Sequence, residues 1–218
     1  MDGVDRELRQ IWTRTRREVD ERLAQFREVR QGGIERVFEE LCFCLLTPQS
    51  SAIAAGRAIS ELAERSLLLD GAAPSIEAVL RRCGVRFPRN KSRYIVEARR
   101  LLDSSTNEGR ILERILSSPG LDPIRLRDDL VKTVRGMGYK EASHFLRNIG
   151  YSGLAILDRH ILRTLQAAGV IERVPTSLSR STYLEIEERF KRYAQRLRIP
   201  PDCLDLVMWS AKTGFVYK

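Results

Sequence analysis

The stretch LRDDLVKTVRGMGYKEASHFLRNI, residues 126–149, contains two helical patterns separated by a pair of glycines. In the first pattern leucine and valine recur at helical spacing, and the pattern stops at Gly136. The second pattern starts near Lys140 and is closed by Gly150. The sequence therefore predicts two helices joined by a tight turn.

Apolar residues recur at helical spacing along the rest of the chain, and no segment alternates convincingly as a strand does. Helix starts are marked by capping residues, as at Asp122 before Pro123, and again at Asp202. There is no internal repeat and no low-complexity linker. These features predict an all-α protein with roughly nine to eleven helices.

The charge balance points to a polyanionic partner. The 218 residues include 38 basic and 29 acidic side chains, which gives a formal net charge of +9 and a pI of about 9.8. Such a surplus favours nucleic acid as the partner. The alternative is a basic surface that only keeps the protein soluble.

The sequence contains no apolar run near the ~18 residues of a membrane span. Its first residues, MDGVDRELRQ, are charged, so we expect no signal peptide, no membrane partner and a cytoplasmic location, nucleoid-associated in a prokaryote. The cysteines match no zinc or iron–sulfur ligand spacing, and we expect reduced thiols and no metal site. They are Cys42, Cys44, Cys83 and Cys203.

The predicted turn, Gly136-Met137-Gly138, has the composition of a phosphate-binding turn. Glycines let backbone N–H groups approach a ligand without an intervening Cβ atom. The N-terminus of the following helix adds partial positive charge, which suits a phosphate. We expect these three residues to bind the DNA backbone; alternatively, the turn only reverses the chain.

Lys140 follows this turn in a chain that strongly prefers arginine. By count the chain has 32 arginines and only six lysines. Arginine stays protonated near neutral pH, whereas a lysine can lose its proton and act as a nucleophile toward carbon. Lys140 is therefore a candidate nucleophile, and an ordinary solvated lysine is the alternative.

Asp158 follows the apolar run Leu154-Ala155-Ile156-Leu157 and lies eighteen residues after Lys140. Its position predicts an N-cap for the next helix. An N-cap carboxylate beside an apolar run can also present one oxygen to a cavity, where it stabilises a cationic, sugar-centred transition state.

Together these residues resemble the helix-hairpin-helix–GPD superfamily of base-excision DNA glycosylases, in which a lysine after the hairpin marks bifunctional glycosylase/AP lyases. The match narrows to the archaeal-type second family of 8-oxoguanine DNA glycosylases and covers about residue 34 to Lys218. Residues 1–33 lie outside it and are assigned only a packing role. The matching stretches are LLTPQS (45–50), RFPRNKSRYIVEAR (86–99), GMGYKEASHFLRN (136–148), LAILDRHILR (154–163) and the final lysine.

The resemblance implies one glycosylase unit over residues 1–218, built from two interleaved helical subdomains that flank a DNA-binding cleft, with residues 126–149 as the helix-hairpin-helix motif. The expected partner is double-stranded DNA containing 8-oxoguanine, bound by a monomer that needs no cofactor. By the resemblance, Lys140 attacks C1′ of the deoxyribose and expels the base. The resulting imine then permits β-elimination, and Asp158 stabilises the developing sugar cation.

The base pocket is assigned by a mixture of residue chemistry and resemblance. Trp209 and Phe87 are candidate aromatic walls for a flipped purine, with core packing as the alternative for each. Gln49 and Asp205 are candidate readers of polar base edges. The resemblance implicates Lys218, the last residue, in recognising the damaged guanine.

Two other functions stay open at this point. The chain is alternatively a non-catalytic helix-hairpin-helix module that binds DNA, or a glycosylase for a different lesion. Lys140 and Asp158 favour the enzyme, because a pure binding module needs neither an amine nor a buried carboxylate at these positions.

The charge analysis predicts strongly salt-dependent binding to undamaged duplex, because arginines displace condensed counterions. Replacing Gly136 or Gly138 by valine should weaken binding to all sequences alike. Fluorescence anisotropy across a salt series measures both effects. Salt-independent affinity would contradict the assignment of the basic surface to DNA.

Overall fold

The computed structural model describes residues 2–118 and 120–217, and over these ranges it contains twelve α-helices, one short 3₁₀ helix and no strand. The expected all-α class is confirmed. The elements are α1 (Asp2–Gln31), α2 (Gly33–Leu46), α3 (Ala52–Glu64), α4 (Leu67–Asp70), α5 (Ala73–Arg82), α6 (Pro88–Ala98), the 3₁₀ helix η1 (Arg99–Leu102), α7 (Arg110–Ser117), α8 (Pro123–Thr133), α9 (Tyr139–Asn148), α10 (Arg159–Ala167), α11 (Arg180–Leu197) and α12 (Pro201–Thr213).

The structure has more α-helices than the nine to eleven expected, because two short helices show no clear apolar periodicity in the sequence. Helix α4 has four residues and α7 has eight, so neither shows more than about two turns of apolar periodicity. None of the helices in the described ranges is long and apolar enough to cross a membrane.

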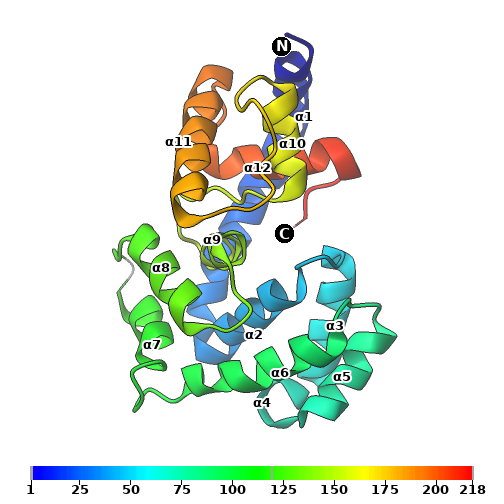
Figure 1. The fold of residues 1–218 in the computed structure, drawn as a ribbon, viewed down its shortest axis with the longest axis vertical. Helices are drawn as coiled ribbons and strands as arrows, with labels where there is room; N and C mark the ends of the chain where they lie inside the picture. Colours follow the sequence, from blue (N-terminus) through cyan, green and yellow to red (C-terminus); the bar gives the residue numbers. More distant parts are fainter. Residues whose placement is uncertain (1, 119, 218) are drawn as a thin grey trace.

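The helices bury two separate apolar cores. One core is formed between Val37 and Leu154, by helices α2 to α9. The other combines α1 with the chain from Ala155 onward. Figure 1 shows α1, α10, α11 and α12 gathered in one half of the molecule, α2 to α8 in the other, and α9 between them.

Helix α1 packs against α12 at the end of the chain as well as against α2, the helix that follows it. It buries Leu8, Ile11, Val19 and Phe26 in the second core, and it lies along α12. The packing role expected for the N-terminal residues is therefore what the structure shows, and the first and last helices share one core.

The predicted hairpin is formed by α8 and α9. Asp122 caps α8 by accepting a hydrogen bond from the Ile124 amide at 2.9 Å. Gly136 has φ of +84°, and a Cβ atom there would lie 2.4 Å from the Tyr94 ring. Glycine is thus required at Gly136 by both backbone conformation and space.

A buried ion pair connects this hairpin to the C-terminal half. The Arg127 guanidinium on α8 donates to both carboxylate oxygens of Glu187 on α11, at 2.8 and 3.0 Å. Both side chains are almost fully buried. Arg127 also donates to Ser143 Oγ on α9, and Glu187 accepts from the Ala155 amide. One pair therefore fixes α8, α9, α11 and the segment before α10.

Replacing Glu187 by Gln should destabilise the protein by about 3 kcal/mol, because it leaves a buried guanidinium without its counter-charge. In a protein of this size we expect Tm to fall by about 6–12 °C. The matched control is Glu185→Gln, which breaks an exposed pair with Arg189 on the same helix and should change stability by less than about 0.5 kcal/mol. Equal melting temperatures for the two variants in calorimetry would contradict the role of the buried pair.

Candidate functional site

Lys140 lies in the first turn of α9, directly behind the glycine turn. Its side chain is 21% exposed. The Lys140 Nζ donates to Thr47 Oγ1 at 3.3 Å and lies 3.2 Å from Glu141 Oε1. A half-buried amine held by a hydroxyl and a carboxylate has a fixed position, unlike the ordinary solvated lysine that the sequence left open.

Thr47 belongs to the loop between α2 and α3, and a second lysine holds that loop. The Lys91 Nζ donates to Leu46 O and Pro48 O, both at 2.7 Å, and to Ser50 Oγ at 3.0 Å. Lys91 is 3% exposed. Burial, together with the positive charge of Lys140, lowers the pKa of the Lys91 amine to about 8.

Sequence reasoning missed Lys91. The signal was available, because the scarcity of lysine that distinguishes Lys140 applies equally to Lys91 within RFPRNKSRYIVEAR. The same loop carries Gln49, an exposed residue with φ of +55°. Lys91 therefore shapes the segment that presents both Thr47 and Gln49.

Asp158 uses its two carboxylate oxygens for different partners. Oδ1 accepts a hydrogen bond from the Ile161 amide at 2.8 Å, which makes Asp158 the N-cap of α10. Oδ2 accepts from the indole Nε1 of Trp209 at 3.1 Å. The run before it, from Leu154 to Leu157, is buried as expected. The carboxylate is therefore both a cap and an oriented charge.

Trp209 is partly buried on α12, with its indole N–H turned toward Asp158. The His160 ring lies edge-on to it at 5.8 Å between centroids, and the Lys212 Nζ lies 5.8 Å from the Trp209 centroid. The sequence made Trp209 a candidate aromatic wall for a base, with core packing as the alternative, but it did not predict the hydrogen bond to Asp158.

Asp205 lies beneath this surface, not on it. It is 4% exposed, and its Oδ2 lies 3.5 Å from Nη1 of the equally buried Arg147. Burial raises the pKa of the Asp205 carboxyl, against the opposing effect of Arg147. Asp205 would have to leave Arg147 to reach a base edge, so the geometry favours a supporting role.

Phe87 projects from the start of α6 with 49% of its surface exposed and φ of +59°. The Arg86 guanidinium lies 5.4 Å from the ring centroid, and the Arg86 amide donates to Ser50 Oγ. Phe87 therefore stands beside the loop of Thr47 and Gln49 as an exposed aromatic. It does not form part of an enclosed wall.

Two backbone amides of the glycine turn already donate hydrogen bonds within the protein. The Met137 amide donates to Val134 O at 3.2 Å, and the Gly138 amide donates to Glu141 Oε2 at 3.3 Å. The Met137 side chain is buried in the first core, whereas Gly136 is exposed. A phosphate at this turn would meet Gly136 first.

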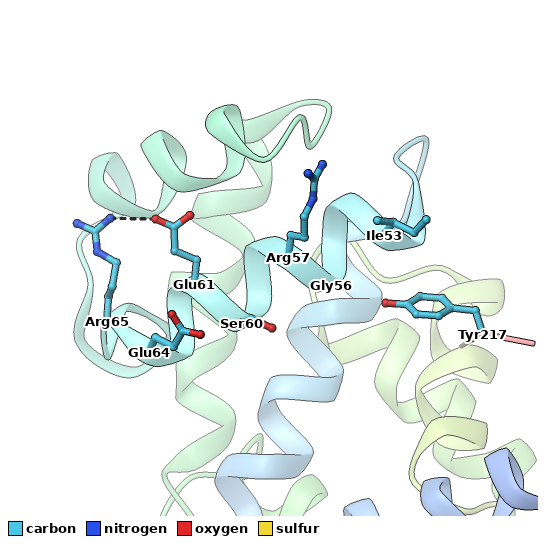
Figure 2. A pocket seen from close by; sticks show the side chains of 8 residues that line it. All are labelled: Ile53, Gly56, Arg57, Ser60, Glu61, Glu64, Arg65 and Tyr217. Carbon is cyan, nitrogen blue, oxygen red and sulfur yellow. Dashed lines mark hydrogen bonds and ion pairs between the residues drawn. The ribbon is translucent and has the colours of Figure 1, made fainter.

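The C-terminal tail is described as far as Tyr217, and Lys218 lies outside the described residues. Tyr217 reaches across to α3, where it borders a groove of about 760 Å³ (Figure 2). The groove is lined by Ile53, Gly56, Arg57, Ser60, Glu61, Glu64, Arg65 and Tyr217.

The structure holds four free cysteines, of which Cys83 is half-buried and the others are buried. Within the residues described, no group of three or more His, Cys, Asp and Glu side chains is placed to hold a metal ion.

Curated relatives match nearly the whole chain. The 8-oxoguanine DNA glycosylase/AP lyase of Fusobacterium nucleatum is 38% identical over 214 residues, which covers 97% of this chain and 96% of the relative. The protein of the same name from Korarchaeum cryptofilum is 40% identical over 217 residues, with 100% and 98% covered.

Solved structures of 8-oxoguanine DNA glycosylases have the same fold as this chain. The 8-oxoguanine DNA glycosylase of Thermotoga maritima superposes with a TM-score of 0.88 at 33% identity, with 100% of each chain covered. The Methanocaldococcus jannaschii 8-oxoguanine glycosylase/lyase, in complex with a 15mer DNA containing 8-oxoguanine, gives 0.87 at 33% identity, also with both chains covered completely. The Ogg-HhH family model, described as 8-oxoguanine DNA glycosylase, matches residues 19–199. Of the functions that the sequence left open, these matches support the enzyme, and the chain belongs to the 8-oxoguanine DNA glycosylase family.

Proposed function

We propose that this chain excises 8-oxoguanine from DNA with Lys140 as nucleophile and Asp158 as the stabilising carboxylate, and that it then cleaves the strand. The reaction is that of the family, a DNA N-glycosylase with AP lyase activity. The observation that carries the residue assignment is the placement of Lys140 Nζ, half-buried between Thr47 Oγ1 and Glu141 Oε1.

The reaction requires the damaged nucleotide to leave the base stack, because C1′ is not accessible inside the duplex. The lone pair of Lys140 Nζ then bonds to C1′ while the bond from C1′ to the base breaks, and its electrons leave with 8-oxoguanine. A carboxylate 3.2 Å away, that of Glu141, offers an acceptor for the proton that the amine must lose.

Opening of the sugar ring converts this adduct into an imine. The imine acidifies C2′, and loss of a C2′ proton expels the 3′ phosphate by β-elimination. The amine thus serves both steps, so the enzyme needs one nucleophile for base release and strand cleavage.

Asp158 contributes charge at a fixed position. Its Oδ1 is bound by the α10 amide and its Oδ2 by the Trp209 indole, so the carboxylate does not need to reorganise as positive charge develops on the sugar.

The remaining recognition residues complete the proposal. Trp209 offers its ring to the flipped base, Phe87 stands exposed at the edge of the site, and Gln49 lies on the loop that Lys91 holds. Lys218 reads the guanine edge. The backbone of Gly136, Met137 and Gly138 takes a DNA phosphate.

The whole chain forms one catalytic unit in this proposal. Both candidate catalytic groups come from the same chain, so a monomer is sufficient. Because its partner is chromosomal DNA, we place the enzyme with the nucleoid in the cytoplasm.

The nucleophile is tested by borohydride trapping on a duplex with one 8-oxoguanine. Lys140→Gln should abolish the trapped covalent complex and leave duplex affinity within about threefold, since the variant removes one amine from a strongly basic surface. The matched control is Lys132→Gln, an exposed lysine on the other helix of the hairpin, which should trap normally. Cross-linking by Lys140→Gln would place the nucleophile elsewhere, with the N-terminal amine as the next candidate.

The orientation of the carboxylate is tested by Trp209→Phe, which keeps an aromatic ring and removes the N–H that binds Asp158 Oδ2. We expect base excision to slow about tenfold, less than the ~100-fold expected for Asp158→Asn, which removes the charge. Single-turnover kinetics measure both variants, and circular dichroism checks that each folds. Wild-type excision by a folded Trp209→Phe protein would show that the hydrogen bond does not contribute.

A further inference from the structure

The C-terminal tail touches both halves of the molecule within two residues. Helix α12 ends at Gly214, whose φ of +82° reverses the chain, and the hydroxyl of Thr213 donates to Phe215 O at 2.9 Å. Val216 then packs against the second core and Tyr217 against the first. Figure 1 shows this end of the chain descending from α12 toward the other half.

Tyr217 meets α3 at a glycine. Gly56 lies in the middle of the helix, in the run AIAAGRAIS, where alanines surround it. A Cβ atom on Gly56 would lie 2.7 Å from the Tyr217 hydroxyl oxygen. Figure 2 shows the tyrosine ring pointing its hydroxyl at this position, with the groove running on past Arg57.

Gly56 lowers the stability of helix α3 relative to alanine, and no special backbone conformation requires a glycine there. Glycine in a helix interior is about 1 kcal/mol less favourable than alanine, and its backbone here is ordinary right-handed helix. Among the described residues, the neighbour that a Cβ atom at Gly56 would meet within 4 Å is Tyr217, through the far end of its side chain. Glycine at this position leaves room for the tyrosine hydroxyl.

The tail follows the helix that carries Trp209, the hydrogen-bond partner of Asp158. Trp209, which binds Asp158, lies in the last full turns of α12, and Tyr217 follows eight residues later on the opposite half. The tail therefore links the helix that carries Trp209 to α3 on the other half.

We propose that Gly56 and Tyr217 form a seat that holds the tail across the two halves, and that both are positioning residues for excision of 8-oxoguanine. The seat holds the tail against α3 at a fixed distance from the helix that carries Trp209, and neither member is a catalytic residue. This inference rests on the proposed function, in which Lys218 reads the guanine edge.

The seat is blocked by Gly56→Leu, which places a side chain where the tyrosine hydroxyl lies. We expect excision of 8-oxoguanine to slow about tenfold or more, while cleavage of a preformed abasic site changes less than about twofold, because no base remains to be read. Leucine favours helix more than glycine, so α3 itself is not weakened. The matched control is Gly3→Leu, at a helical glycine with nothing within 4 Å of its Cβ position, which should leave both rates unchanged.

A compensating pair tests the contact itself. With Gly56→Ala, the new methyl meets the tyrosine oxygen at 2.7 Å, whereas the next ring atom, Cζ, is at 4.0 Å. Tyr217→Phe removes only that oxygen. Gly56→Ala should therefore slow excision, Tyr217→Phe should slow it by a smaller factor because the ring stays while its oxygen is lost, and the double variant should be faster than Gly56→Ala alone.

Excision by Gly56→Leu at the rate of Gly3→Leu would overturn the inference. A parallel loss of excision and abasic-site cleavage would also overturn it, because the contact would then serve folding or DNA binding in general. A variant without Lys218 shows how much excision slows when the residue proposed to recognise the guanine edge is absent. Failure of the proposed function is distinguishable, because the wild-type protein itself would then release no 8-oxoguanine.

Discussion

The buried pair between Arg127 and Glu187 connects the hairpin that carries Lys140 to the segment that leads into Asp158. Arg127 lies on the first helix of the hairpin and binds Ser143, one turn after Lys140 on the second helix. Glu187 binds the Ala155 amide, three residues before Asp158. A buried guanidinium and carboxylate stay together because separating them leaves an uncompensated charge out of water. One buried ion pair therefore joins the two segments on which the candidate catalytic residues lie.

The candidate catalytic residues were accessible to sequence reasoning because each carries a local signal. Lys140 is a rare lysine behind a glycine turn, and Asp158 is a capping residue after an apolar run. The helix-hairpin-helix was predictable for the same reason, since helical spacing and turn glycines are both short-range features. Neither α4 nor α7 was anticipated, because a segment of one or two turns shows too little periodicity.

The partners of these residues were not predictable in the same way. Thr47 lies 93 positions from Lys140, and Trp209 lies 51 positions from Asp158, so only the tertiary fold brings them into contact. The same limit applies to Asp205. Its sequence position on the last helix suits a pocket residue, but the helix turns it inward to Arg147. Whether a polar residue on a helix points inward or outward depends on the helices packed around it. A single sequence does not show which helices these are.

The shared core of α1 and α12 has a consequence for how the protein is made. The buried residues of the first core all lie between Val37 and Leu154, so they can pack together once about residue 154 has left the ribosome. The second core needs Leu8 and Met208 together, and closing so long a loop is slow and entropically costly. During synthesis α1 therefore lacks α12, one of its partners in the second core, until the last helix emerges. Asp158 gains its Trp209 partner only then, so the proposed site is completed at the end of synthesis.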